Sequence, residues 1–154
     1  MKDSKMIRIK FGLYLLFLAI ISVSIILMPF TVDNNAIIPI WLSGSLFWIG
    51  LLGVIVTVIM INKGRKKDTS FRKKQKGSKQ FGLIHFFQNK LAIVFDTIMF
   101  SAIICFILFS LTVNINLLQF ICLSVFVFSF GMHCMLNGVN YIYINYIVRS
   151  SVSK

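Results

Sequence analysis

The uncharged run Phe11-Gly-Leu-Tyr-Leu-Leu-Phe-Leu-Ala-Ile-Ile-Ser-Val-Ser-Ile-Ile-Leu-Met-Pro-Phe30 decides the fold class of this chain. An α-helix needs roughly 20 apolar residues to cross a bilayer core about 30 Å thick, and this run supplies twenty residues. Asp96 interrupts a later apolar run, and His133 is the titratable group of another. The sequence predicts an all-α protein with four transmembrane helices, the last three over Ile40–Ile61, Leu91–Val113 and Leu117–Val139.

Composition agrees with a membrane protein and excludes an ordinary soluble domain. Of the 154 residues, 58% are hydrophobic and 13% are charged, and the mean hydropathy is +0.89. Soluble domains carry about 25% charged residues, so this chain has too little polar surface to cover a globular core. The net charge is +12, but the apolar excess excludes a simple soluble nucleic-acid-binding protein. Its three cysteines are too few for a disulfide framework.

The distribution of positive charge predicts the orientation in the membrane. Residues 1–10 carry four lysines and arginines, and Lys63–Lys79 carries nine, whereas Thr31–Pro39 has one charge, Asp33. The positive-inside rule therefore predicts a multi-pass protein of the cell membrane with both termini and the basic linker in the cytoplasm. The first apolar run exceeds the roughly 7–15 residues of a signal-peptide core, so we expect it to be retained. The isoleucine-rich, alanine-poor composition hints at a bacterial source.

The predicted organisation has five parts. They are a basic cytoplasmic tail (1–10), a first transmembrane hairpin (11–62), a polybasic cytoplasmic linker (63–80), an interfacial segment with a second transmembrane hairpin (81–147), and a cytoplasmic tail (148–154). The connection at 114–116 is so short that the third and fourth spans must form an antiparallel pair. We expect the two hairpins to pack as a four-helix bundle.

The basic linker Lys63–Lys79 has no apolar periodicity, so we expect it to be irregular. Each basic residue beside a membrane gains about 1 kcal/mol from anionic headgroups, and Phe71 is placed to enter the interface. The linker is either a tether that senses lipid or docks a partner, or simply a determinant of topology. We favour the second, because the positive-inside rule already requires such a segment. The residues expected to contact anionic lipid are Arg65, Lys66, Lys67, Arg72, Lys73, Lys74 and Lys76.

Polar residues form a stripe on each helix of the second hairpin. At about 100° per residue, one face before and inside the third span collects His85, Gln88, Asn89, Ala92, Asp96 and Met99. A narrow arc of the fourth span collects Cys122, Ser129, His133, Asn137 and Asn140. Asp96 lies nineteen residues before Ile115 and His133 eighteen after it, so the two lie at similar depth. We predict an Asp96–His133 contact, direct or bridged by Asn137, near the inner boundary of the membrane.

This stripe is the candidate polar or partner site of the chain. An ionisable group inside a span is costly and usually turns toward a partner or a wet cavity. The site is either a proton- or ligand-responsive centre or a structural clasp that fixes the register of the hairpin. We favour the clasp, because Asp96 lies near the end of its span. The candidate residues are Asp96, His133, Asn89, Asn137, Asn140 and His85.

The sequence points away from catalysis. The acidic residues are Asp3, Asp33, Asp68 and Asp96, glutamate is absent, and no nucleotide-binding, hydrolase or zinc-protease motif occurs. We expect no enzymatic activity, no cofactor, no metal site and no nucleic-acid partner. Two hypotheses remain. The first is a non-enzymatic accessory or regulatory subunit, or an immunity-type protein, that acts through a larger membrane partner. The second is a small homo-oligomeric transporter or channel that uses Asp96 and His133.

Overall fold

The computed structural model describes residues 2–31, 39–71, 73, 90–112 and 117–152, and their regular elements are helices. The all-α class is therefore confirmed. The elements are α1 (Lys2–Leu27), the 3₁₀ turn η1 (Met28–Phe30), α2 (Ile40–Lys67), α5 (Lys90–Thr112), α6 (Leu117–Leu136) and α7 (Val139–Val152). Prolines mark two boundaries, since Pro29 lies in η1 just after α1 and Pro39 is the N-cap of α2.

Four helices in the described part of the chain are long and apolar enough to cross a membrane. The qualifying stretches are Lys5–Phe30, Ile40–Lys67, Lys90–Leu111 and Leu117–Leu136. Each includes most of one apolar run expected from the sequence. The length and composition of these helices fit a multi-pass membrane protein.

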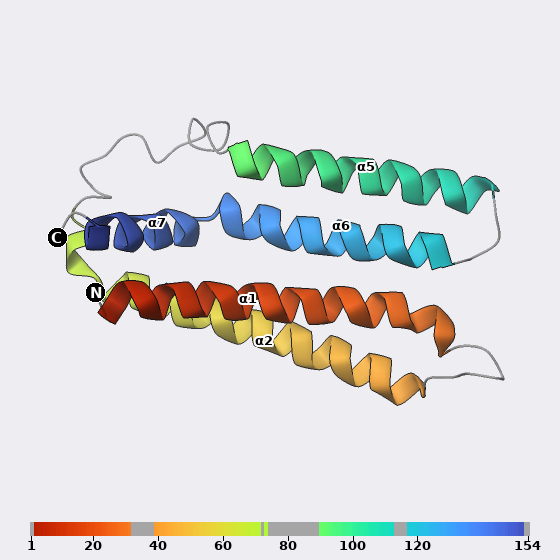
Figure 1. The fold of residues 1–154 in the computed structure, drawn as a ribbon, viewed down its shortest axis with the longest axis horizontal. Coiled ribbons are helices and arrows are strands. Elements are labelled where there is room, and N and C mark those ends of the chain that lie inside the picture. The colour runs from red at the N-terminus through yellow and green to blue at the C-terminus, as the bar shows by residue number, and fades with distance from the viewer. Residues whose placement is uncertain (1, 32–38, 72, 74–89, 113–116, 153–154) are drawn as a thin grey trace.

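The helices pack side by side as two antiparallel pairs (Figure 1). Helix α1 packs along α2, and α5 packs along α6. The pairs meet where α1 contacts α6, so α1 has a helix on two sides while α5 packs mainly on α6. The start of α1, the end of α2 and the whole of α7 lie at one end of the molecule, whereas α5 begins further in, level with the break between α6 and α7 (Figure 1). The described basic residues of α1 and α2 are therefore gathered at that end.

Glycines allow α1 to approach its neighbours closely. A Cβ atom on Gly50 of α2 would lie 2.6 Å from Ile21 Cγ1 and 3.0 Å from the backbone oxygen of Phe17. A Cβ on Gly53 would lie 2.3 Å from the ring of Phe17, and one on Gly131 of α6 would lie 2.5 Å from a methyl carbon of Leu18. The missing side chain lets the backbone of α1 approach at Gly50, and it makes room for Phe17 at Gly53 and for Leu18 at Gly131. These close approaches are made within the chain, against α1.

The start of the linker differs from the expected irregular segment. Helix α2 continues past Ile61 to Lys67, and Asp68 ends it in an extended conformation. Lysine and arginine are good helix formers, and positive charge is favourable at a helix C-terminus. The Arg65 guanidinium also donates a 2.6 Å hydrogen bond to Asn62 Oδ1 one turn earlier. These local gains extend the helix beyond its apolar part.

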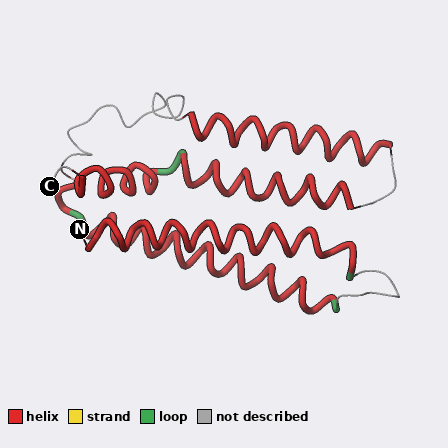
Figure 2. The backbone as a smooth tube through the Cα atoms, in the orientation of Figure 1, coloured by secondary structure: helices red, strands yellow, loops and turns green. Residues whose placement is uncertain are grey.

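The fourth span also ends earlier than expected, at Leu136 rather than at Val139. Asn137 and Gly138 form a short loop, visible between α6 and α7 in Figure 2. After it the chain resumes as α7, a separate helix that contacts α1, α2 and α6. Tyr141, Tyr143 and Tyr146 lie on this helix, and Tyr143 is buried in the protein core.

Candidate polar site at the helix break

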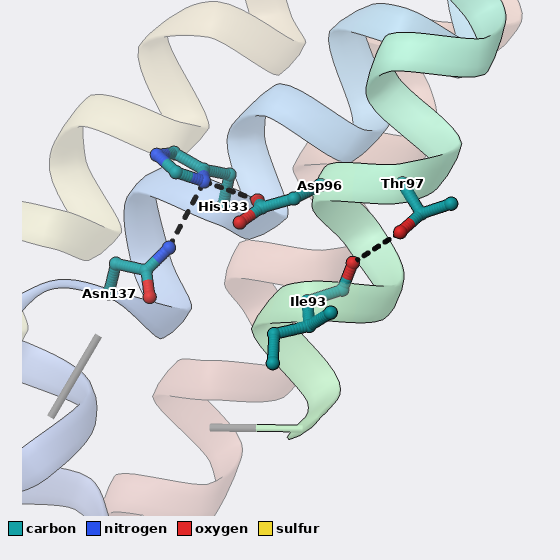
Figure 3. A network of polar contacts seen from close by, with 5 residues as sticks. All are labelled: Ile93, Asp96, Thr97, His133 and Asn137. Carbon is teal, nitrogen blue, oxygen red and sulfur yellow. Dashed lines mark hydrogen bonds and ion pairs between the residues drawn. The ribbon is translucent and has the colours of Figure 1, made fainter. Parts of the chain in front are cut away.

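Asp96 of α5 and His133 of α6 are in direct contact, as the depth argument predicted (Figure 3). His133 Nδ1 lies 2.5 Å from Asp96 Oδ1. Asn137 joins the pair, since its Nδ2 lies 3.0 Å from the same Nδ1 atom. The side chains of His133 and Asp96 are 25% and 20% exposed, so the contact is largely but not wholly covered.

The contact between Asp96 and His133 requires one proton between the two atoms. Either Nδ1–H donates to the carboxylate, or the protonated carboxyl donates to the Nδ1 lone pair. Nδ1 has either one hydrogen or one lone pair, and the contact with Asp96 uses it, so Asn137 Nδ2 at 3.0 Å makes a secondary contact. The three side chains form one network around the Nδ1 atom. Chemically, it is able to hold a proton or to serve as a closed clasp.

Packing around the pair fixes the two side chains on the contact face of the hairpin. Ala92, one turn before Asp96, is 1% exposed, as expected for a small residue where α5 and α6 approach closely. The rings of Phe95 and Phe128 pack between the helices with their centroids 6.3 Å apart. The imidazole stacks on Phe130, one turn earlier on α6. Thr97, drawn beside the network in Figure 3, donates to the Ile93 carbonyl of its own helix.

The break after α6 holds Asn137 beside the imidazole. Asn137 N–H still donates to the His133 carbonyl at 3.0 Å, while Gly138 N–H donates to Met135. A Cβ on Gly138 would lie 2.9 Å from the Cys134 carbonyl oxygen, so this tight turn requires glycine. The side-chain oxygens of Asn137 and Asn140 are buried, and neither accepts a hydrogen bond from a described residue.

The structure joins three of the six candidate residues, Asp96, His133 and Asn137. Asn140 lies beyond the break, in the first turn of α7 rather than on α6, and its part in the site stays a prediction. His85 and Asn89 lie outside the described residues. Met132 and Met135 are buried core residues, while Cys134 between them is exposed. Neighbouring residues of this stretch therefore point in different directions.

Phe71 occupies a different place from the one expected. It is 2% exposed, and its ring packs against Tyr143 at 5.2 Å and Tyr146 at 5.3 Å between centroids. The expectation that it enters the membrane interface is wrong, because α7 offers two aromatic rings that cover it. Asp68 Oδ1 accepts hydrogen bonds from the backbone N–H groups of Ser70 and Phe71 and closes the turn that carries the ring.

Four of the seven residues expected to contact lipid are described: Arg65, Lys66, Lys67 and Lys73. Lys66, Lys67 and Lys73 are exposed, whereas the Nε atom of Arg65 is buried. Arg72, Lys74 and Lys76 lie outside the described residues. Contact with lipid remains a prediction for all seven.

Sequence reasoning missed the polar contacts between the two hairpins. The Tyr14 hydroxyl donates to the Gly131 carbonyl at 2.6 Å, and the Ser124 hydroxyl donates to the Ser22 carbonyl at 2.9 Å. Both acceptors are backbone oxygens, and since every residue has one, the residue types do not indicate which oxygen will accept. The helix break did have a signal, since Asn-Gly is a strong turn dipeptide.

Comparison of the chain with protein-family models, with curated proteins and with solved structures found no match.

Proposed function

We propose that this chain is a non-enzymatic accessory or regulatory subunit of the cell membrane that acts through a larger membrane-protein partner. An immunity protein against a secreted membrane-active peptide or toxin belongs to the same class. The observation that carries the proposal is the direct Asp96–His133 contact, which pairs the two ionisable side chains across α5 and α6. A contact of this kind is suited to holding two helices together.

The hydroxyl groups along the helices support the same proposal. Ser24 donates to the Ile21 carbonyl of its own helix, as Ser110 does to Phe106. Ser124 donates to the Ser22 carbonyl of the neighbouring helix. These hydroxyls use their hydrogens on backbone carbonyls, so they offer little to a permeating ion or solute. A subunit that binds another protein needs no such path.

In the proposed arrangement the four long helices form a bundle that spans the membrane, with both termini and the basic linker in the cytoplasm. The basic ends of α1 and α2 lie at the same end of the molecule, which supports this orientation. A cysteine-free variant with a single cysteine at Lys66 tests it. A membrane-impermeant maleimide should label that cysteine in inside-out vesicles and fail to label it in intact cells. Labelling from outside would reverse the orientation.

Helix α5 is the proposed contact for the partner. It packs mainly on α6, and its other faces present exposed apolar side chains such as Phe100, Ile104 and Leu111. In a membrane this surface meets either lipid or another apolar helix. Like α2, α5 is largely unburied along its apolar length and packs mainly on one long helix, so it has surface available for a partner helix.

Crosslinking in the native host tests the partner. A photoreactive residue at Ile104 of α5 should yield a crosslink to one larger membrane protein, recovered with the tagged chain at near-equal stoichiometry. The matched control is the same probe at Trp48 of α2, which is equally exposed but on the other hairpin. If Ile104 crosslinks only to lipid or to a second copy of the chain, the accessory proposal fails.

The alternative function is a small homo-oligomeric transporter or channel with its polar site at Asp96 and His133. The observation that favours it is the partial exposure of the pair, which leaves a shared proton within reach of water. Proton-driven flux in liposomes that disappears in Asp96→Asn would support it. Absence of flux with the correctly folded native chain would remove it.

A further inference from the structure

A cavity of about 320 Å³ lies at the basic end of the molecule, where three helices meet. Ile7 and Lys10 of α1 form one wall, Gly64 and Lys67 at the end of α2 form another, and Tyr143 and Ile147 of α7 form a third, while one side is open. The volume falls within the range of small-ligand sites. The cavity is separate from the Asp96–His133 contact, which lies between α5 and α6.

The charge of this cavity favours an anion. Lys10 and Lys67 bring positive charge from two different helices. Asp68 also lines the cavity, but its Oδ1 atom accepts hydrogen bonds from Ser70 N–H, Ser70 O–H and Phe71 N–H. These hydrogen bonds stabilise the carboxylate of Asp68 within its own turn and reduce its repulsion of a bound anion. Lys5, Arg8, Lys63 and Lys66, elsewhere on the same ends of α1 and α2, add to the positive potential.

The position of the cavity along the helices suggests where the anion comes from. Lys10 immediately precedes the apolar run of α1, and Gly64 follows Ile61, the last apolar residue of α2, by three positions. If these runs fill the bilayer core, the cavity lies at the level of the headgroups. Its apolar side chains Ile7 and Ile147 suit the glycerol and the first methylene groups of a lipid.

We propose that this cavity binds the phosphate of an anionic phospholipid, held between Lys10 and Lys67. The ligand is a phosphate group, and the lipid headgroup is its source. This inference goes beyond the proposed function. It needs only the location in a membrane and no partner protein, so its test uses the purified chain and fails or succeeds independently of the partner.

Thermal unfolding of the full chain in a neutral detergent tests the site. The probes are phosphatidylglycerol, phosphatidylcholine and inorganic phosphate, each titrated separately. Phosphatidylglycerol should raise the unfolding midpoint at concentrations where phosphatidylcholine does not. Lys10→Gln and Lys67→Gln should each weaken the apparent affinity about fivefold, the change expected for one basic residue near a phosphate. Lys63→Gln and Lys66→Gln, on the same helix end but outside the cavity, should weaken the apparent affinity clearly less, since they act only through the general positive potential.

A variant that fills the cavity distinguishes lipid binding at a defined site from general attraction of anionic lipid to the basic end of the molecule. Gly64→Leu adds volume without changing charge, and it should abolish the effect of phosphatidylglycerol. Gly64→Ala is the folding control, since its Cβ would lie 3.6 Å from the Tyr143 hydroxyl, an ordinary contact distance. If Lys63→Gln and Lys66→Gln weaken binding as much as Lys10→Gln and Lys67→Gln, the proposal of a defined phosphate site fails. It also fails if a folded Gly64→Leu variant binds phosphatidylglycerol normally. If inorganic phosphate protects as well as phosphatidylglycerol, the lipid source is overturned.

Discussion

The Tyr14 hydroxyl donates a 2.6 Å hydrogen bond to the backbone carbonyl of Gly131, a residue 117 positions further along the chain. This bond joins α1 to α6, and therefore the first helix pair to the second. The carbonyl is accessible because residue 131 has no side chain, and the methyl groups of Leu18 fill the space that a Cβ would take. One small residue thus allows both the apolar contact and the polar contact between the pairs.

Tyr14→Phe should destabilise the protein by about 0.6–1 kcal/mol, the usual value of one hydrogen bond between helices. The ring is retained, so the loss reports the hydroxyl and not the packing. Unfolding of the purified chain in mixed detergent micelles measures it. An unchanged unfolding free energy would show that water or lipid replaces the bond at no cost.

Gly50→Ala should cost about 1–3 kcal/mol, the range for overpacking. Its Cβ would meet the backbone nitrogen of Ile21 and the backbone oxygen of Phe17, each at 3.0 Å, and backbone atoms yield less easily than side chains. Gly44→Ala is the matched control on the same helix, because nothing lies within 4 Å of its Cβ position. The control should be neutral or slightly stabilising, since alanine is the better helix former. Equal effects at both positions would contradict the close approach of α1.

Asp96→Ala and His133→Ala should each destabilise the second hairpin by about 1–3 kcal/mol, because each leaves a largely covered polar partner unsatisfied. The double variant should cost less than the sum of the two, which a double-mutant cycle in detergent measures as a coupling energy. Strictly additive effects would mean that the contact contributes nothing to stability. Under the accessory proposal, the same variants should reduce recovery of the partner in proportion to their effect on folding.

Phe71→Ala should expose the start of the linker to protease. Loss of a buried phenylalanine costs about 3 kcal/mol or more, so the segment should open locally about 100-fold more often. Trypsin cleavage after Lys67 and Lys73 measures the opening. Ser70→Ala is the milder companion, because it removes the hydroxyl that lies 3.1 Å from the Tyr146 hydroxyl but keeps the rings packed. Equal cleavage of Phe71→Ala and the native chain would contradict the aromatic anchor.

Sequence predicted the spans and the Asp96–His133 contact because both depend on position along a helix. Apolar length predicts a span, and equal distance from a short turn predicts equal depth. The sequence did not predict which side of α1 each neighbour would occupy. That choice depends on the shape of surfaces around Gly50 and Gly131, and on backbone acceptors such as the Ser22 carbonyl. Periodicity contains neither kind of information.

The end of α6 was misplaced for a different reason. Hydropathy averaged over about 20 residues does not resolve a two-residue turn such as Asn137-Gly138, although the Asn-Gly dipeptide is itself a turn signal. The helical extension of α2 to Lys67 was missed because the linker was judged by apolar periodicity alone. Charged residues form helices without an apolar stripe when local propensity and the helix dipole favour it. In both places local backbone chemistry, not hydrophobicity, set the boundary.

The central place of α1 has a consequence for biosynthesis. This helix leaves the ribosome before α6, to which its partners Gly131 and Ser124 belong. During translation, the face of α1 that bears Tyr14 is made before α2, the basic linker and α5, and its hydrogen-bond partner follows them. The hydrogen bonds between the two helix pairs therefore form only after α6 has been synthesised.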